Sequence, residues 1–258
     1  MALRLAPATV GSALAVRLAL PPTDAAQELG AVTVTARGLA SEIVRDGPEP
    51  HVILRGKLRG PRRVAVRYEV TRRRPAEVRP VIVPVQAPGP ELLPYLTPSP
   101  LLQSRSLLVR DFLETYASPR LDAPGGADIV RTIQEVTREH LPHAADGKTL
   151  TLDVIRSGRG KRIGIERVFT TSLRCAGVPA RFVEGLNLKS STRRKRVFWT
   201  EAWANGIWWP ISASAGWSGR LPRAYVALAR DGRRVVTLEG NGTVTYAVEA
   251  RPAQAGAS

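Results

Sequence analysis

The stretch Thr151–Leu186, TLDVIRSGRGKRIGIERVFTTSLRCAGVPARFVEGL, decides the fold of this chain. Its middle part has the spacing of one buried helical stripe, carried by Ile165, Val168, Phe169, Ser172, Leu173 and Ala176. Gly177 is suited to the C-cap of that helix, and Pro179 blocks its continuation. We therefore predict an extended entry, a glycine-rich turn at residues 158–160, a helix, a tight turn and a strand.

The order of these elements, with GRG before the helix and LRCAGVPARFVEGL after it, resembles the core of the transglutaminase-like superfamily. In that papain-like fold a catalytic cysteine opens the helix. The later stretch Val197–Ser214, VFWTEAWANGIWWPISAS, is similar to the strands that carry the family's His and Asp. The resemblance covers most of residues 128–214. It implies an α+β fold in which a helix packs on an antiparallel sheet, preceded by a small N-terminal all-β unit.

The resemblance also implies that the catalytic residues of the family are missing. The family's spacing back from Gly177 puts Arg162 at the position of the nucleophile. The tryptophans of the later stretch put the His position at Val197 and the Asp position at Ser212. Acyl transfer needs a thiolate, an imidazole that moves its proton and a third group that orients the imidazole. We therefore expect a pseudoenzyme in which no residue is catalytic.

One group of the family resembles this chain more closely, namely bacterial proteins in which an inactive transglutaminase domain is fused to seven transmembrane helices. They have a β-rich region before the core and a tail similar to residues 221–248. The resemblance implies a periplasmic or extracytoplasmic domain that accompanies a membrane module. It also implies a binding or sensing role in a peptide-modifying system with ATP-grasp amidoligases.

The net charge of +16, with 38 Lys and Arg against 22 Asp and Glu, favours anionic partners. The N-terminus of a helix also attracts negative charge. We therefore predict that the former cleft binds an acidic peptide or protein. The expected anion-binding residues are Arg159, Lys161, Arg162, Arg193, Arg194 and Arg196. Trp199 and Trp209 are candidates for aromatic residues lining the same groove.

Two alternative functions belong to other classes. The only cysteine, Cys175, could serve a transglutaminase-like hydrolase or transferase if it lay within hydrogen-bond reach of His140 or His143. However, it falls at the C-terminal end of the predicted helix, where the helix dipole disfavours a thiolate. A basic nucleic-acid-binding protein is the second alternative, but only Tyr68 accompanies the basic run Arg72–Arg74 as an aromatic partner for bases.

The composition predicts no metal site and no cofactor. With one Cys and three His in 258 residues, no structural zinc pattern is visible. No run of 18 apolar residues occurs, so we expect no transmembrane segment in this chain. Met1–Leu20 could be the remnant of a signal peptide, but the alternation in Ala13–Leu20 favours a first strand.

The predicted domain boundaries follow changes in composition. Residues 1–74 form a β-sandwich-like unit with alternating strands at Ala31–Ala36, His51–Leu58 and Arg63–Val70. Residues 75–100 are a proline-rich linker. Residues 101–250 form the inactive core, and residues 251–258 are a flexible tail.

Within the core the sequence predicts several further elements. Helices are expected at Leu101–Tyr116 and after the N-cap residue Asp128. Strands at Ala180–Leu188, Val197–Ala204 and Ile207–Ile211 follow the central helix, the last two joined by a turn at Asn205–Gly206. A final hairpin joins Val235–Glu239 to Val244–Glu249.

Overall fold

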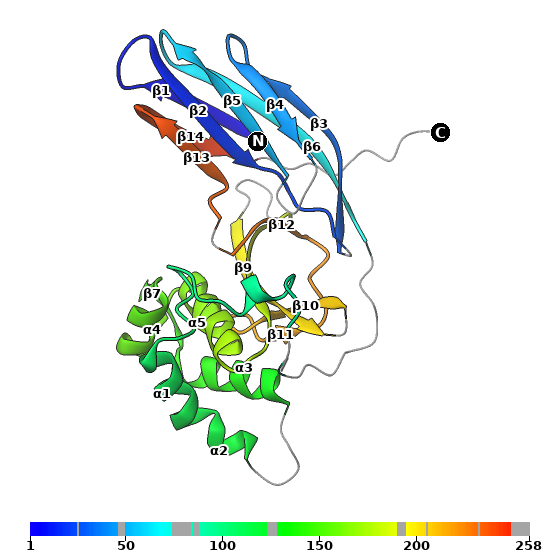
Figure 1. Ribbon diagram of the computed structural model, residues 1–258, viewed down its shortest axis with the longest axis vertical. Helices are drawn as coiled ribbons and strands as arrows, with labels where there is room; N and C mark the ends of the chain where they lie inside the picture. The colour runs from blue at the N-terminus through cyan, green and yellow to red at the C-terminus, as the bar shows by residue number, and fades with distance from the viewer. Residues whose placement is uncertain are drawn as a thin grey trace.

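Two units make up the structure, a computed structural model that describes residues 1–24, 26–45, 50–73, 84, 88–122, 128–189, 195–204, 206–231 and 233–248. The chain begins in a β-sandwich and continues into a unit of five described α-helices, one 3-10 helix and a five-stranded sheet. It returns to the sandwich through its last described strands (Figure 1). The predicted α+β class with an N-terminal all-β unit is confirmed.

The sandwich consists of two four-stranded antiparallel sheets, in the orders β14-β1-β6-β3 and β13-β2-β5-β4. Its strands are β1 (Ala2–Pro7), β2 (Ser12–Ala19), β3 (Gln27–Thr35), β4 (Ala40–Val44), β5 (His51–Leu58), β6 (Arg62–Arg72), β13 (Val236–Gly240) and β14 (Gly242–Ala247). Apolar and polar residues alternate along them, so one face of each sheet packs inward. In β6, for example, Val64 and Val66 are buried while Arg63 and Arg67 are exposed.

The last two strands correct the sequence-based expectation of a final hairpin within the core. β13 pairs with β2 and β14 pairs with β1, so the two strands lie in different sheets. Their apolar residues Leu238 and Val244 pack against the sandwich core. Burial of these side chains between the two sheets outweighs the local turn signal at residues 240–242. The C-terminal strands therefore complete the N-terminal sandwich.

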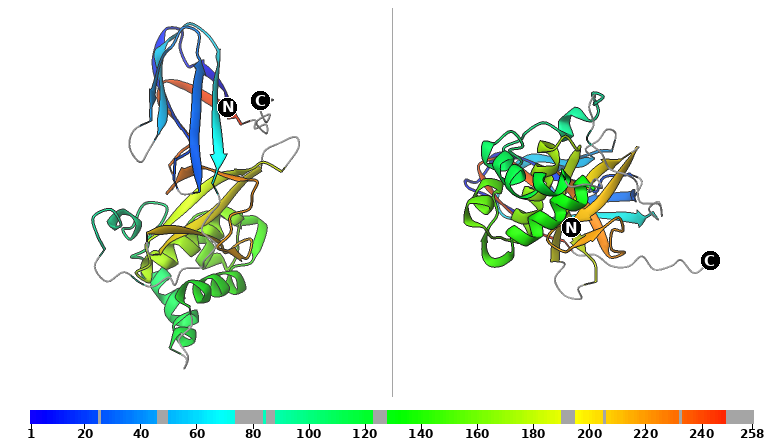
Figure 2. Two further views of the ribbon diagram at one scale, coloured as in Figure 1. Left: turned by 90° about the vertical axis from the view of Figure 1, so that its right-hand side faces the viewer. Right: turned by 90° about the horizontal axis from the view of Figure 1, so that it is seen from below.

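The second unit is built on one antiparallel sheet in the order β11-β10-β9-β8-β12. Its strands are β8 (Ala180–Asn187), β9 (Lys195–Ala204), β10 (Ile207–Ser212), β11 (Trp217–Ser218) and β12 (Tyr225–Arg230), and the short strand β7 (His143–Lys148) lies apart from them. The helices are η1 (Leu93–Tyr95), α1 (Leu107–Tyr116), α2 (Ser118–Leu121), α3 (Ile129–His140), α4 (Thr151–Ser157) and α5 (Arg162–Cys175). Figure 2 shows the helices gathered on one side of this sheet.

The central helix α5 confirms the prediction made from its apolar stripe. Val168, Phe169 and Leu173 are fully buried in the core cluster shared with α3 and the sheet. Gly177 adopts a left-handed conformation with φ 76°, which glycine tolerates best. The Val178 N–H donates to the Leu173 carbonyl at 2.9 Å, and this bond closes the helix end.

Three other local predictions meet different outcomes. Asp128 is the N-cap of α3, as expected, because its carboxylate accepts from the N–H groups of Val130 and Arg131. The predicted first helix begins at Leu107, six residues later than expected. The expected extended entry at Thr151 is wrong, since Thr151–Ser157 forms helix α4 with Val154 fully buried against the core.

The sandwich is joined to the second unit by the side chain of Gln27, at the start of β3. Gln27 is buried, and its amide accepts from the Ala227 N–H at 2.9 Å while donating to the Ala227 carbonyl at 3.1 Å. β12 is an edge strand, and its pairing with β8 is irregular between Ala227 and Ala229. The amide therefore satisfies backbone groups where the strand ladder is interrupted.

Residues 75–83 and 85–87 of the predicted linker and the whole predicted tail, residues 251–258, lie outside the described residues. The division of the chain at residues 74, 100 and 250 stays a prediction. None of the described helices is long and apolar enough to cross a membrane.

We expect Gln27→Leu to lower the free energy of unfolding by about 2 kcal/mol, because it leaves the buried backbone groups of Ala227 without partners. Urea denaturation measures the change. The matched control is Gln103→Leu, which removes one exposed local bond to the Pro100 carbonyl and is expected to change stability by less than about 0.5 kcal/mol. Equal effects of the two substitutions would contradict the role of Gln27.

Candidate functional site

The start of α5 is held in place by glycines that allow close backbone contact. Gly160 forms bridges to both ends of β7, at His143 and Lys148. A Cβ atom on Gly147 would lie 2.5 Å from the Gly160 carbonyl carbon, and one on Gly164 would lie 2.6 Å from the Lys148 carbonyl oxygen. Contacts this short exclude a side chain. The GRG turn and first turn of α5 are thus packed directly on β7.

The exposed end of α5 carries three of the predicted anion-binding residues. Arg162 is the first residue of the helix, and Lys161 is its N-cap without a side-chain cap. Both are exposed, and no acidic residue stands in the first turn. Arg159 pairs with Asp146 at 3.3 Å on the surface. Among the described residues, no ion pair involves Arg162 or Lys161.

The remaining basic candidates come from the segment before β9. Arg193 and Arg194 lie outside the described residues. Arg196 is exposed and pairs with Glu184 at 2.5 Å. The charges of both Arg196 and Glu184 act on Arg167 of α5, whose guanidinium lies 5.6 Å from the centre of the Phe182 ring. Arg196 therefore lies near the N-terminal half of α5, within electrostatic reach of Arg167.

The three positions matched to the family triad have different surroundings. Val197 packs with Trp199 on the sheet face that carries Leu221 and Ala227. Thr200 of the same strand faces α5 instead, where its hydroxyl lies 2.7 Å from that of Thr170. Ser212 is completely buried and donates to Glu166 of α5 at 2.6 Å. Val197 therefore lies on the sheet face away from α5, whereas Ser212 contacts α5 directly.

Glu166 is a buried residue of the candidate site that the sequence analysis missed. Its carboxylate is fully buried and accepts from the hydroxyls of Ser212 and Ser214 at 2.6 and 2.8 Å. The Ser214 N–H donates at 2.9 Å and the Ala213 N–H at 3.4 Å. The only sequence signals were a Glu inside the buried helical stripe and the small polar run after β10. Neither signal shows that the two segments meet.

Burial raises the pKa of Glu166 to about 7, although the hydrogen bonds from Ser212 and Ser214 act in the opposite direction. All of these donors are neutral, so they compensate the loss of solvent only in part. Near neutral pH the group is therefore close to half protonated. A carboxyl in this state can gain or lose a proton within the physiological range.

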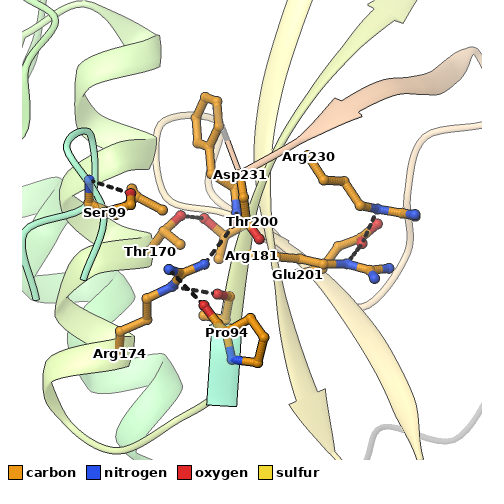
Figure 3. Close-up of polar contacts among 12 residues, drawn as sticks. Pro94, Ser99, Thr170, Arg174, Arg181, Thr200, Glu201, Arg230 and Asp231 are labelled. Carbon is orange, nitrogen blue, oxygen red and sulfur yellow. Dashed lines mark hydrogen bonds and ion pairs between the residues drawn. The ribbon is translucent and has the colours of Figure 1, made fainter. Parts of the chain in front are cut away.

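A second buried carboxylate, Glu201, occupies the other face of β9. The Nε of Arg181 donates to it at 2.6 Å, and the Nε of Arg230 lies 3.5 Å away. Figure 3 shows both arginine side chains directed at Glu201. Arg230 also pairs with Asp24, which precedes β3. Burial by itself raises the pKa of Glu201, but the charges of Arg181 and Arg230 outweigh it and hold the pKa below the ordinary value. This carboxylate therefore stays charged.

Arg174 of α5 is the centre of a third polar cluster, after those of Glu166 and Glu201. Figure 3 shows its guanidinium between the helix and Asp231, to which it donates at 2.8 Å. It also donates to the carbonyls of Thr97 and Ala180 at 3.0 and 2.7 Å. These bonds tie the segment around η1 to the C-terminal end of α5.

Cys175 is the last residue of α5 and is half-buried beside the core. Burial raises the pKa of its thiol. His140 is stacked on Tyr116 with ring centres 3.9 Å apart, and His143 is exposed on β7. In the described part of the chain, no hydrogen bond joins Cys175 to a histidine, the usual base for a cysteine nucleophile.

The expected groove tryptophans are corrected by their burial. Trp199 is 0% exposed and Trp209 is 5% exposed, so neither ring is available to line a groove. Trp208 is half-buried instead and contacts Tyr95, with ring centres 4.6 Å apart. The Arg181 guanidinium lies 4.1 Å from the centre of the Trp208 ring. The error arose because strand alternation does not tell which face is covered.

No group of three or more His, Cys, Asp and Glu that could hold a metal ion occurs within the described ranges.

Residues 119–213 match the family model of the transglutaminase-like superfamily. A search of curated proteins finds no match. Among solved structures, the chain is similar to a candidate cysteine protease from Cytophaga hutchinsonii, with a TM-score of 0.68 and 16% identity over 95% of this chain and 86% of the other. It is also similar to the periplasmic domain of TgpA from Pseudomonas aeruginosa, with a TM-score of 0.36 and 12% identity over 82% of this chain and 92% of the other. The first likeness shows that the fold is shared.

We expect Glu166 to make stability depend on pH. Its pKa is about 7 in the folded protein against an ordinary value of 4.5, so the folded chain holds this proton more tightly than the unfolded chain. Raising the pH through this interval therefore removes stability, by about 3 kcal/mol in total. The contribution is fully present below pH of about 4.5 and is lost above pH of about 7.

Urea denaturation of wild type and Glu166→Gln across this pH range isolates the effect. The wild type should lose stability relative to the variant as the pH rises, and the difference should level off above the folded-state pKa. The exposed glutamate of β6 provides the control Glu69→Gln, which is expected to follow the wild-type curve. A difference between wild type and Glu166→Gln that is constant with pH would disprove the assignment.

Proposed function

We propose that the chain is a non-catalytic binding module for an acidic peptide or protein, built on the part of the chain, residues 119–213, that matches the transglutaminase-like family model. The observation that carries the proposal is the start of α5, where Lys161 and Arg162 are exposed. The family resemblance assigns the position of the nucleophile to Arg162. The proposal has two parts, the loss of catalysis and the gain of an anion site. Each part has its own test.

The loss of catalysis rests on the chemistry of three side chains. Arg162 is not a nucleophile at physiological pH, because its guanidinium stays protonated. Val197 has no group that accepts a proton. Ser212 is buried and already donates its hydroxyl to Glu166, so it is unsuited to orient a base. Cys175 lies at the other end of α5, where the helix dipole disfavours a thiolate.

The Glu166 cluster supports the same conclusion. The carboxylate and the Ser212 hydroxyl that binds it are both 0% exposed, so a substrate has no access to them. Their hydrogen bonds join α5 to the end of β10. These hydrogen bonds favour one arrangement of helix and sheet. We assign it a structural role within a site that no longer reacts.

The anion site is supported by the electrostatics of the helix start. The first N–H groups of a helix have no partner within the helix, and here no side chain caps them. The helix dipole adds partial positive charge at this end. Exposed Arg162 can bind a carboxylate through two parallel N–H···O hydrogen bonds, and Lys161 adds a second positive charge. Acidic side chains of a peptide match this arrangement.

We extend the proposal to the system in which the protein works and to its place in the cell. A module that binds acidic peptides without reacting suits a peptide-modifying system in which amidoligases extend or alter peptide carboxylates. In this setting the chain acts outside the cytoplasm, alongside a membrane module. The binding site would then present or sense the peptide for another component.

The first part of the proposal, the loss of catalysis, predicts that the chain performs no acyl transfer. Wild type and Cys175→Ala are incubated with a glutamine-containing peptide and a primary amine, and ammonia release is followed. We expect both proteins to give the background rate, because no thiolate forms beside a base. Turnover by wild type that disappears in Cys175→Ala would refute the pseudoenzyme assignment.

The second part of the proposal, the anion site at the start of α5, predicts that the chain binds a short oligoglutamate peptide saturably. Isothermal titration calorimetry measures this binding. We expect Arg162→Ala to weaken binding about tenfold, because one charge-assisted contact is lost. Arg59→Ala is the matched control, since Arg59 is exposed in the sandwich between β5 and β6. Equal affinities of the three proteins, or no binding to wild type, would exclude the site at α5.

A further inference from the structure

Four turns of the β-sandwich lie at the end that is farther from the helices. β3 and β6 run antiparallel, with Gln27 opposite Arg72 and Thr35 opposite Ala65. Gln27 and Arg72 both donate hydrogen bonds to carbonyls of β12, so this end of the two strands faces the second unit. Figure 1 shows the turns of the other end above the helices and the five-stranded sheet. We call this other end the distal tip, and its turns are residues 8–11, 36–39, 59–61 and 241.

Backbone hydrogen bonds hold the distal tip together. The Gly11 N–H donates at 2.7 Å to the carbonyl of Leu58, the last residue of β5, and this bond joins two of the turns. The Ala8 N–H donates at 3.1 Å to the Asn241 carbonyl between β13 and β14. The tip therefore presents its side chains from a backbone that is already ordered, which lowers the loss of conformational entropy on binding.

The charged side chains of the distal tip are all basic. Arg37 and Arg59 are exposed in two of the turns, and exposed Arg62 follows the second of these turns as the first residue of β6. None of the four turns contains an acidic residue. No ion pair joins these three arginines to another residue that the structure describes, whereas Arg55 of β5 is paired with Glu42 at 3.0 Å. The positive charge of the tip therefore has no acidic partner within the described part of the chain.

A large apolar side chain is exposed at the same tip. Val10, in the turn between β1 and β2, is 74% exposed, the highest value for a large apolar residue that the structure describes. A single exposed apolar side chain is ordinary on a protein surface. Together with basic turns it has a specific use, because the apolar group can enter the acyl boundary of a bilayer while the arginines bind the headgroups.

We propose that the distal tip docks onto a bilayer that contains anionic phospholipids. The negative surface of such a bilayer attracts the three arginines, and burial of Val10 in the acyl boundary is favourable. Neither a nucleic acid nor a short acidic peptide offers an apolar medium to Val10. None of the four turns has an aromatic side chain on which bases could stack. The tip belongs to the sandwich, so the inference does not depend on the function proposed for the start of α5.

Cosedimentation of the whole chain with vesicles made of equal parts of phosphatidylcholine and phosphatidylglycerol tests the proposal. We expect binding to these vesicles, weaker binding at high salt and no binding to vesicles of phosphatidylcholine alone. The double substitution Arg37→Gln with Arg62→Gln is expected to weaken binding at least about tenfold, because two contacts with the anionic surface are lost. The matched control is Arg105→Gln with Arg110→Gln, which removes two exposed charges from the second unit and should bind as wild type does.

The apolar contact has its own pair of variants. Val10→Ser is expected to weaken vesicle binding about threefold, because less apolar surface is buried. Leu107→Ser is the matched control, since Leu107 is 68% exposed at the start of α1, and it should bind as wild type does.

The proposal is overturned if wild type does not bind the anionic vesicles, or if either control weakens binding as much as the tip substitution that it matches. Binding to a DNA duplex without binding to vesicles, lost in the double variant of Arg37 and Arg62, would also overturn it and would assign the tip to nucleic acid. Thermal melting of each variant confirms that it is folded.

Discussion

The arrangement of the molecule depends on a buried charge network in which Arg181 and Arg230 neutralise Glu201 and Asp24. Two positive and two negative groups balance, so no net charge is left within this network. Arg181 and Glu201 belong to the five-stranded sheet, while Asp24 lies in the segment that enters β3. Loss of one member would leave a buried charge unpaired, which is far more costly than the pair is stabilising. The network therefore restricts how the sandwich can sit on the sheet.

Glu166 and Glu201 show how different partners decide the state of two buried carboxylates. Both are nearly inaccessible to solvent, and burial alone raises the pKa of each. Glu201 has two guanidinium partners, and its pKa falls below the ordinary value. Glu166 has only hydroxyl and backbone donors, and its pKa rises to about 7. The helix-to-sheet contact is therefore sensitive to pH, whereas the contact between the two units stays charged.

The sequence predicted local elements well because their signals are local. The apolar stripe of α5, the Asp128 cap and the strands around Asn205–Gly206 each depend on residues close together in the chain. Sheet membership is not local: β13 and β14 are adjacent in sequence yet pair with strands more than 200 residues away. The Glu166 cluster also escaped prediction, because it joins segments whose meeting depends on the completed fold.

The excess of basic over acidic side chains lies mainly on the surface of this fold. Buried arginines such as Arg174, Arg181 and Arg230 are matched by acidic partners, so they contribute little to the external field. The net charge of +16 therefore belongs mainly to exposed side chains. Exposed charge alone attracts any anion and is screened by salt. Selectivity must come from places where geometry adds to charge, and the start of α5 combines positive charge with backbone that is fixed by its contacts with β7.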